Sequence, residues 1–148
     1  MSRAQLEELE KHGMYLSSPR GVSMWPMIRQ GKDIVEIRAL EKPPKRYDLV
    51  MYSRTDKQGV IHRVLYKKED IYVICGDNCH TKEYVKPEQI KGIVTRFYRN
   101  GKWHSVTEKP YLLYVHLWTD LFFIRQPLFY IRDKLKRFFG KRQKGRNV

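Results

Sequence analysis

The chain contains few cysteines and no long apolar run. Its two cysteines, Cys75 and Cys79, lie four residues apart without a second pair or a tight histidine cluster. This is too little for a zinc site or a disulfide scaffold, so we expect neither and take a reduced, cytosolic context as the default. Residues 1–13 are too polar and acidic for the apolar core of a secretory signal. An N-terminal anchor of roughly 20 apolar residues is also missing.

Acidic side chains are scarce relative to basic ones. Sixteen Asp and Glu residues stand against thirty Lys and Arg residues, which gives a formal charge of +14 in 148 residues. The length is that of one domain. A charge of this sign favours an anionic partner, namely a phospholipid surface, a nucleic acid or an acidic polypeptide, and it does not choose among the three.

The distribution of apolar residues divides the chain into a lead-in (1–19), a β-domain (20–108) and a tail (109–148). Residues 4–11 have the spacing of one or two helical turns. Within the β-domain, short apolar runs are bounded by Gly, Pro, Asp or Asn, as in the strands of a compact sheet or barrel. Asn100-Gly101 predicts a tight hairpin turn. The fold class is therefore mainly β, with predicted strands at Ile34–Ile37, Asp48–Tyr52, Val60–Leu65, Ile71–Cys75 and Gly92–Tyr98.

The tail combines aromatic and basic residues. Residues 111–139 are dominated by large apolar side chains, and the last 17 residues carry eight Lys or Arg against one Asp. Proline removes a backbone donor, so we expect two amphipathic helices broken near Gln126-Pro127. Residues 111–146 suit an interfacial helix on anionic lipid, and a core-packing helix with a solvated basic end is the alternative. Because the chain has no recognised nucleic-acid-binding motif, we expect no nucleic-acid partner.

A serine in a glycine- and proline-bounded turn is the first candidate for chemistry. Ser23 lies in Gly21-Val22-Ser23-Met24-Trp25-Pro26. A serine hydroxyl becomes an effective nucleophile only when a neighbouring base takes its proton and donors stabilise the oxyanion. Gly-x-Ser by itself is common in loops, so the candidacy of Ser23 depends on the motifs downstream in the chain.

Four further motifs come after Ser23 in order. With it, they resemble the conserved boxes of type I signal peptidases and of the related self-cleaving phage and SOS repressors, over about residues 20–100. The resemblance implies a compact β-fold of the signal-peptidase and repressor C-terminal-domain kind. It also implies a serine endopeptidase that cleaves a precursor or signal peptide without a metal or cofactor. The four motifs lie within 45–52, 59–64, 75–78 and 90–94.

His62-Arg63-Val64 identifies the branch that the chain resembles. Bacterial-type signal peptidases and repressors use a lysine base, whereas the endoplasmic-reticulum, archaeal and sporulation-associated branch has a His-Arg-Val motif. The resemblance therefore implies Ser23 as nucleophile and His62 as general base. Neutral imidazole suits this role, because its unperturbed pKa of about 6.5 lets it accept a proton near neutral pH.

The acid that orients His62 remains open between two residues. Asp77, in Gly76-Asp77-Asn78, has the place of the family's first acid, and Lys82 has the approximate place of a second one. Glu83 is next to Lys82 and is the other candidate. Either Asp77 or Glu83 orients the imidazole as in a catalytic triad, or the enzyme is a Ser–His dyad.

The resemblance also suggests the oxyanion site and the substrate cleft. Gly21 stands where many signal peptidases have a serine that binds the oxyanion, so backbone donors such as the Ser23 amide would serve instead. Met24 and Trp25 resemble the apolar residues beside the nucleophile that help to form the cleft, and packing into the core is their alternative.

Departures from the family pattern keep other functions open. Asp33 is preceded by lysine and Asp48 by tyrosine, where the family has Gly-Asp. Together with Lys82, these departures allow a catalytically impaired peptide-binding module. The missing anchor allows a cytosolic protease that processes a precursor peptide. A self-cleaving repressor is disfavoured, because no DNA-binding domain precedes the peptidase region and the base is not lysine.

Overall fold

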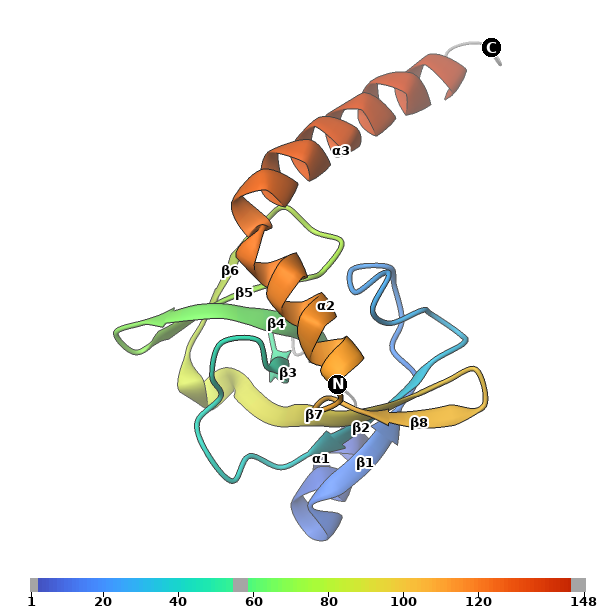
Figure 1. The fold of residues 1–148 in the computed structure, drawn as a ribbon. Helices are drawn as coiled ribbons and strands as arrows, with labels where there is room; N and C mark the ends of the chain where they lie inside the picture. Colours follow the sequence, from blue (N-terminus) through green and yellow to red (C-terminus); the bar gives the residue numbers. More distant parts are fainter. Residues whose placement is uncertain (1–2, 55–58, 145–148) are drawn as a thin grey trace.

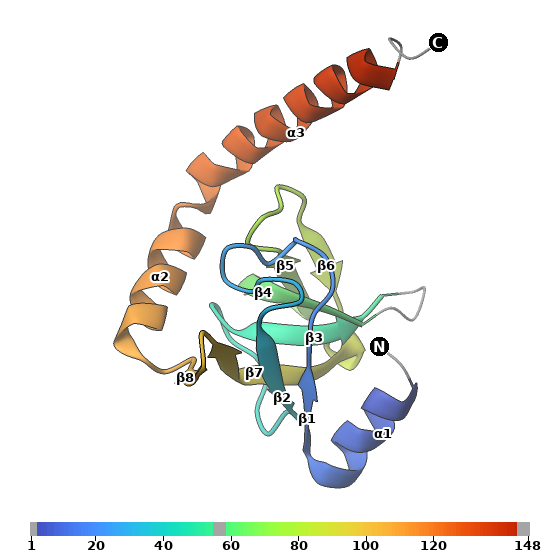
Figure 2. The ribbon, with the colours of Figure 1, turned by 90° about the vertical axis from the view of Figure 1, so that its right-hand side faces the viewer.

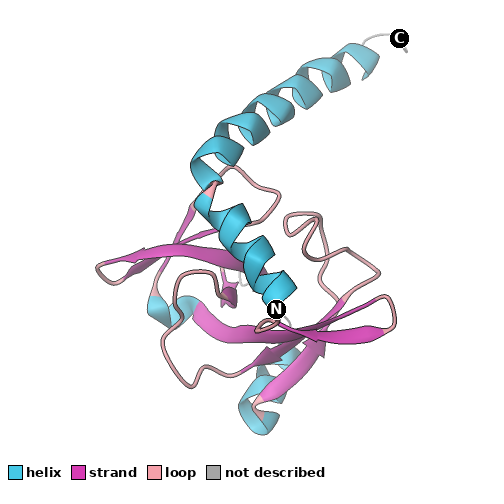
Figure 3. Ribbon diagram, in the orientation of Figure 1, coloured by secondary structure: helices cyan, strands magenta, loops and turns pink. Residues whose placement is uncertain are grey.

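The computed structural model describes residues 3–54 and 59–144. In these residues, eight strands form one antiparallel sheet in the order β1-β2-β7-β3-β4-β5-β6, with β8 paired to β7 (Figure 1). The predicted mainly β fold is confirmed, together with helices at both ends of the chain (Figure 3). The elements are α1 (Arg3–His12), β1 (Met14–Ser17), β2 (Ile34–Arg38), β3 (Leu49–Ser53), β4 (Gly59–Lys68), β5 (Ile71–Cys75), β6 (Glu83–Val85), η1 (Pro87–Gln89), β7 (Ile90–Arg99), β8 (Lys102–Ser105), α2 (Lys109–Asp120) and α3 (Phe122–Lys144).

Each of the five predicted strands is present, as β2, β3, β4, β5 and β7. The Asn100-Gly101 hairpin is also present between β7 and β8. Both of its turn residues have positive φ, 51° at Asn100 and 83° at Gly101, which is the conformation expected of a two-residue hairpin turn. The predicted N-terminal helix corresponds to α1.

Two short strands were not predicted, and both matter for the site. Strand β1 lies at one edge of the sheet, where Tyr15 pairs with Ile37 of β2. The lead-in is therefore joined to the sheet, and α1 packs Leu9 into the same core. Strand β6 lies at the other edge, where Glu83 pairs with Ile74 of β5. Strands of three or four residues leave too few positions for alternation to be recognised.

Two main apolar clusters hold the sheet together. The larger is built around Val35, Ile37, Leu49 and Met51 of the central strands, and it includes Met24, Met27 and Ile28 from the loop that carries Ser23. It also takes Tyr111 and Val115 from α2, so the first helix of the tail is part of the core. The second cluster contains Val50, Tyr52, Val64 and Ile74 on β3, β4 and β5.

The break between the tail helices differs from the prediction. It lies at Leu121, and Pro127 is inside α3. Tertiary contacts explain the position, because Phe122 is buried against Leu65, Val73 and Cys75 at the point where the chain turns. From there α3 runs away from the sheet. The end of α3 and the helix α1 lie at opposite ends of the molecule (Figures 1 and 2). The structure describes side chains up to Phe138 and the backbone up to Lys144. The basic end of the predicted 111–146 segment therefore lies outside the described residues.

No helix in the described residues is long and apolar enough to cross a membrane.

Candidate active site

A cleft of about 1090 Å³ brings together residues that are distant in sequence. Its walls are β1 with the loop after it, the start of β4, the loop after β5, and Asp133 of α3. Ser23, His62 and Glu83 all line this cleft. Of the other predicted site residues, Gly21 and Met24 line it too. Trp25 is 55% exposed and is not among the lining residues, and Asp77 is fully buried behind the cleft.

Asp33 anchors the loop that carries Ser23. Its side chain is fully buried and accepts hydrogen bonds from the Arg29 backbone N–H and the Arg29 Nη2, each at 2.8 Å, and from Arg99 Nη2 at 2.7 Å. Burial by itself would raise the pKa of Asp33, but the bonds from Arg29 and Arg99 outweigh it and lower this pKa to about 2. Arg99 also donates to the carbonyls of Pro26 and Met27. The ionised carboxylate of Asp33 thus attaches the loop to Arg99 of β7.

Gly76 allows the Ser23 carbonyl and the His62 ring both to lie close against the loop after β5. A β-carbon added at Gly76 would lie 2.6 Å from the Ser23 carbonyl oxygen and 3.0 Å from His62 Nε2. The Ser23 carbonyl also accepts a 2.7 Å hydrogen bond from the Asn78 backbone N–H. Any side chain at position 76 would push these groups apart, so the close approach requires glycine.

His62 is held on one side of its ring and unpartnered on the other. It lies on β4, is 3% exposed, and places Nδ1 3.1 Å from Glu83 Oε1 and 3.1 Å from the Tyr52 hydroxyl. Its Nε2 is buried without a hydrogen-bond partner among the described residues, so no bond joins it to Ser23 Oγ here. An ionised carboxylate can only accept, so Nδ1 carries a proton, and in a neutral imidazole Nε2 then presents a lone pair. Catalytic hydrogen bonds of this type commonly tighten only when substrate binds.

Glu83 is the acid that contacts His62. Arg54 donates to both of its carboxylate oxygens, through Nε at 2.8 Å and Nη2 at 2.5 Å. Burial would raise the pKa of Glu83, but hydrogen bonds from His62, Arg54 and Tyr52 outweigh it and hold this pKa far below its usual range. Glu83 is therefore ionised at every pH at which an imidazole base would work.

Asp77 pairs with Arg63 and makes no described contact with His62. Its two carboxylate oxygens accept from Arg63 Nε at 2.8 Å and Arg63 Nη2 at 2.7 Å, and the Tyr114 hydroxyl donates to one of them at 3.0 Å. Successive residues of a strand face opposite sides, so His62 points into the cleft and Arg63 points towards α2. Asp77 and Arg63 thus connect the site to the tail as a buried ion pair.

Lys82 points away from the imidazole. Its Nζ lies 5.7 Å from the centre of the Tyr66 ring and 5.4 Å from that of the Phe122 ring. Glu83, the next residue of the chain, contacts His62 instead. Sequence reasoning included Glu83 as an alternative, but it missed Tyr52 and Arg54, for which no motif gave a signal. The Arg63 partner of Asp77 was visible only as the second residue of the His-Arg-Val motif.

The two cysteines are less suited than Ser23 to act as a nucleophile, because burial keeps their thiols protonated. Cys75 is buried, and burial raises the pKa of its thiol to about 12. Cys79 lines the cleft near the Ser23 carbonyl, and burial raises its pKa as well. The thiolate is the reactive form, so both side chains are held in the unreactive one. Among the described residues, no group of three or more His, Cys, Asp or Glu side chains is placed to hold a metal ion.

Two strand segments with an unpaired side border the cleft. Strand β1 pairs with β2 alone among the described strands. On β4, pairing with β5 begins only at Arg63, so residues 59–62, which line the cleft, pair with β3 alone among the described strands. Unpaired strand backbone can hydrogen-bond an extended peptide.

Comparisons with protein-family models, curated proteins and solved structures give no match for this chain.

Proposed function

We propose that this protein is a serine endopeptidase of the signal-peptidase-like type that cleaves a precursor or signal peptide. The state of His62 carries the proposal. Its Nδ1 is bonded to the ionised Glu83, and its buried Nε2, close to Gly76 as the Ser23 carbonyl is, has no hydrogen-bond partner in the described part of the chain. A nucleophile, a base and an orienting acid on three separate chain segments are the minimal parts of a Ser–His–acid triad.

The geometry supports a two-step acyl transfer. His62 Nε2 accepts the proton of Ser23 Oγ as the oxygen bonds to the substrate carbonyl carbon, and backbone N–H groups beside Ser23 stabilise the oxyanion. The imidazolium is stabilised by Glu83, and it donates its proton to the leaving amine as the peptide bond breaks. Water then attacks the acyl-enzyme with His62 again as base, which releases the acid product and regenerates Ser23.

The substrate would bind as an extended strand. Its backbone would pair with the unpaired sides of β1 and residues 59–62, both of which line the cleft that holds Ser23. Met24, Ile28 and Met51 supply apolar lining for side chains near the scissile bond. We therefore expect the substrates to be short, extended peptide segments rather than folded proteins.

The backbone conformation of Tyr47 is compatible with the family pattern from which this residue departs. Tyr47 stands where the signal-peptidase pattern has glycine, and it has a φ of 80°. This is the region of backbone conformation that glycine adopts readily. The Tyr47 hydroxyl donates a 2.9 Å hydrogen bond to Asp120, which helps to hold the uncommon conformation. A glycine-type turn at this point supports the resemblance despite the substitution.

Labelling with a fluorophosphonate probe tests the catalytic proposal. We expect the full chain to form a stable adduct at Ser23, located by mass spectrometry of proteolytic fragments, because only an activated serine attacks such a probe. The Ser23→Ala variant should take up no label, and Ser53→Ala, which removes a serine at the end of β3, should be labelled like the wild type. A correctly folded protein that is never labelled would favour the peptide-binding module.

We further propose that the tail places the enzyme on an anionic membrane surface. Helix α3 turns its polar face to the domain, where Arg125 and Arg132 bond to the loop after β5, and leaves apolar side chains outside. A solvent-facing apolar stripe is the reverse of a normal surface helix and indicates a further partner. Basic side chains beside such a stripe suit anionic lipid. The stripe consists of Leu121, just before α3, and of Ile124, Leu128, Ile131 and Leu135, each between 46% and 58% exposed.

The width of the stripe favours lipid over a second helix. Phe123 flanks it and is 70% exposed. A two-helix seam needs only a narrow line of apolar residues and would leave this ring in water, whereas a bilayer surface would cover it together with the stripe.

Co-sedimentation with lipid vesicles tests the membrane proposal. We expect the protein to bind phosphatidylcholine vesicles that contain phosphatidylserine, more weakly at high salt, and to bind pure phosphatidylcholine poorly. A Leu128→Gln/Ile131→Gln variant should bind at least about 100-fold more weakly, because burial of each side chain is worth roughly 1.5–3 kcal/mol. Tyr84→Gln, at an exposed aromatic of β6, is the control. Equal binding by both variants would refute the proposal, and a dimer lost in the double variant would indicate a second copy instead.

A further inference from the structure

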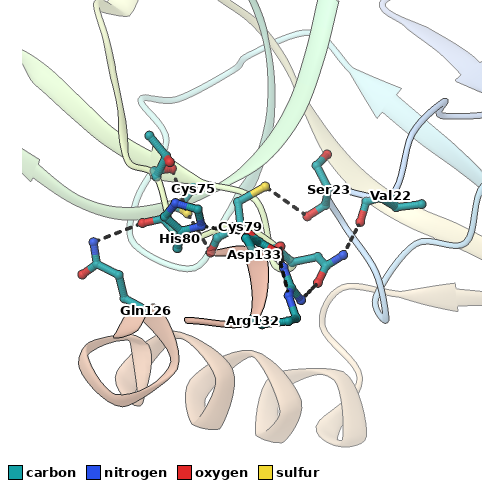
Figure 4. Close-up of polar contacts among 10 residues, drawn as sticks. Val22, Ser23, Cys75, Cys79, His80, Gln126, Arg132 and Asp133 are labelled. Atoms are coloured by element: carbon teal, nitrogen blue, oxygen red, sulfur yellow. Dashed lines mark hydrogen bonds and ion pairs between the residues drawn. The ribbon is translucent and has the colours of Figure 1, made fainter. Parts of the chain in front are cut away.

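Helix α3 is bonded to the loop of residues 76–81, which lies directly behind Ser23. Gln126 Nε2 donates to the His80 carbonyl at 3.1 Å, and Asp133 lies 3.1 Å from His80 Nδ1. Arg132 donates twice to Asn78, from Nη1 to Oδ1 at 2.6 Å and from Nη2 to the carbonyl at 3.1 Å. Figure 4 shows Gln126, Arg132 and Asp133 on the α3 side of this loop and Val22 and Ser23 on the other.

Asn78 connects these contacts to the nucleophile. Its backbone N–H donates to the Ser23 carbonyl at 2.7 Å, and its side-chain Nδ2 donates to the Val22 carbonyl at 3.1 Å. The loop residue therefore holds two successive carbonyls of the nucleophile segment. The Val22 carbonyl also accepts a backbone hydrogen bond from Trp25 at 3.1 Å, and Asn78 adds a side-chain donor to it.

The orientation of the Asn78 amide depends on Arg132. A guanidinium can only donate hydrogen bonds, so the amide must turn its oxygen towards Arg132. The amide nitrogen then faces Val22, which is the orientation that the nucleophile segment needs. A hydrogen bond from a charged guanidinium is also stronger than one between neutral groups. Without Arg132, water could satisfy either end of the amide, and the preference for one orientation would weaken.

We propose that Arg132 is a positioning residue for Ser23, acting through Asn78. This inference rests on the proposed peptidase function and deepens it: the tail is part of the active-site scaffold as well as the proposed membrane contact. Arg132 is on the polar face of α3 and 31% of its side chain is exposed, so it can be replaced without creating a cavity in the core. A displacement of the reacting group by about 1 Å can lower a rate about 100-fold, so we expect a kinetic effect without unfolding.

Four variants separate this role from a general effect on folding. Arg132→Met removes both bonds to Asn78 together with the ion pair to Asp133 at 2.9 Å, and Arg132→Lys keeps the charge and one donor. Asn78→Asp keeps an acceptor for Arg132 but places a carboxylate oxygen against the Val22 carbonyl. Arg137→Met removes the same charge from an exposed position of α3 and is the matched control.

Two readouts on the full-length protein test the proposal. The first is the rate constant for acylation of Ser23 by the fluorophosphonate probe, and we expect it to fall about 10- to 100-fold in Arg132→Met and Asn78→Asp. Arg132→Lys should recover part of the rate, and Arg137→Met all of it. The double variant Arg132→Met/Asn78→Asp should be no slower than the slower single variant, because both changes break the same connection. The second readout is hydrogen exchange of the backbone N–H of Asn78, which donates to the Ser23 carbonyl. This exchange should be faster in Arg132→Met.

The outcomes keep the two proposals apart. Wild-type acylation rates in Arg132→Met, or unchanged exchange at Asn78, would overturn the positioning role while leaving the peptidase proposal intact. Losses that multiply in the double variant would also overturn it, because they would show independent effects. If the wild type is never acylated, the peptidase proposal fails, and faster exchange at Asn78 in Arg132→Met would still show that α3 controls the Ser23 segment.

Discussion

Replacement of His62 by alanine is expected to slow acylation of Ser23 by at least about 10⁴-fold, since loss of a triad histidine in a serine peptidase removes the proton acceptor. The substitution leaves the Ser23 loop untouched, because Asp33, Arg99 and Asn78 hold it independently. The measurement is the rate of fluorophosphonate labelling, with thermal unfolding of each variant as a check on folding.

His104→Ala is the matched control for this experiment. His104 also pairs with a glutamate, Glu108, at 3.2 Å, but it lies on β8 and does not line the cleft. Its replacement should leave the labelling rate unchanged. A His62→Ala protein that is labelled within tenfold of the wild-type rate would rule out His62 as the base.

The same assay distinguishes the two candidate acids. Glu83→Gln should lower the labelling rate by about 10³- to 10⁴-fold, because a neutral amide neither imposes the right tautomer on His62 nor stabilises its charged form. Asp77→Asn keeps the contact to Tyr114, and its main effect should be on stability, because the neutral amide no longer balances the charge of the buried Arg63. The opposite ranking of the two rates would assign the orienting role to Asp77.

Replacement of Arg63 by methionine is expected to lower the free energy of unfolding by about 3–5 kcal/mol. The substitution leaves Asp77, which is fully buried, without its charged partner. It also removes the bonds from Arg63 Nη1 to the Tyr47 carbonyl at 2.9 Å and to the Tyr111 hydroxyl at 3.2 Å. Urea unfolding followed by circular dichroism measures the loss.

Two further variants check the physical reason for this loss. Arg63→Met/Asp77→Asn should regain part of the stability, because it removes the uncompensated buried charge. Arg46→Met breaks a surface pair with Asp120, in which both side chains are about half exposed, and should change stability by less than about 1 kcal/mol. Equal losses for Arg63→Met and Arg46→Met would contradict the assignment of Asp77–Arg63 as the ion pair that joins the sheet to the tail.

Local patterns determined most of the fold. Apolar runs of four to seven residues with clear boundaries located β2, β3, β4, β5 and β7, and the conformational preferences of Asn100-Gly101 located the hairpin. These features depend on near neighbours in the chain, which is why the sequence alone predicts them. The helical break was misplaced because Pro127 is a local signal, whereas the burial of Phe122 against β4 and β5 decides where the chain turns.

The pairing within the site was decided by the tertiary structure. The sequence by itself determined the candidate residues, namely Ser23, His62, Asp77 and Glu83, and the order in which they occur. It could not choose between Asp77 and Glu83, because each lies more than ten residues from His62 and the contact depends on how β4, β5 and β6 align. That alignment turns Glu83 to His62 and Asp77 to Arg63, and it brings Arg132 of α3 to Asn78. Contacts between distant segments arise from the packing of the whole chain, which no local pattern records.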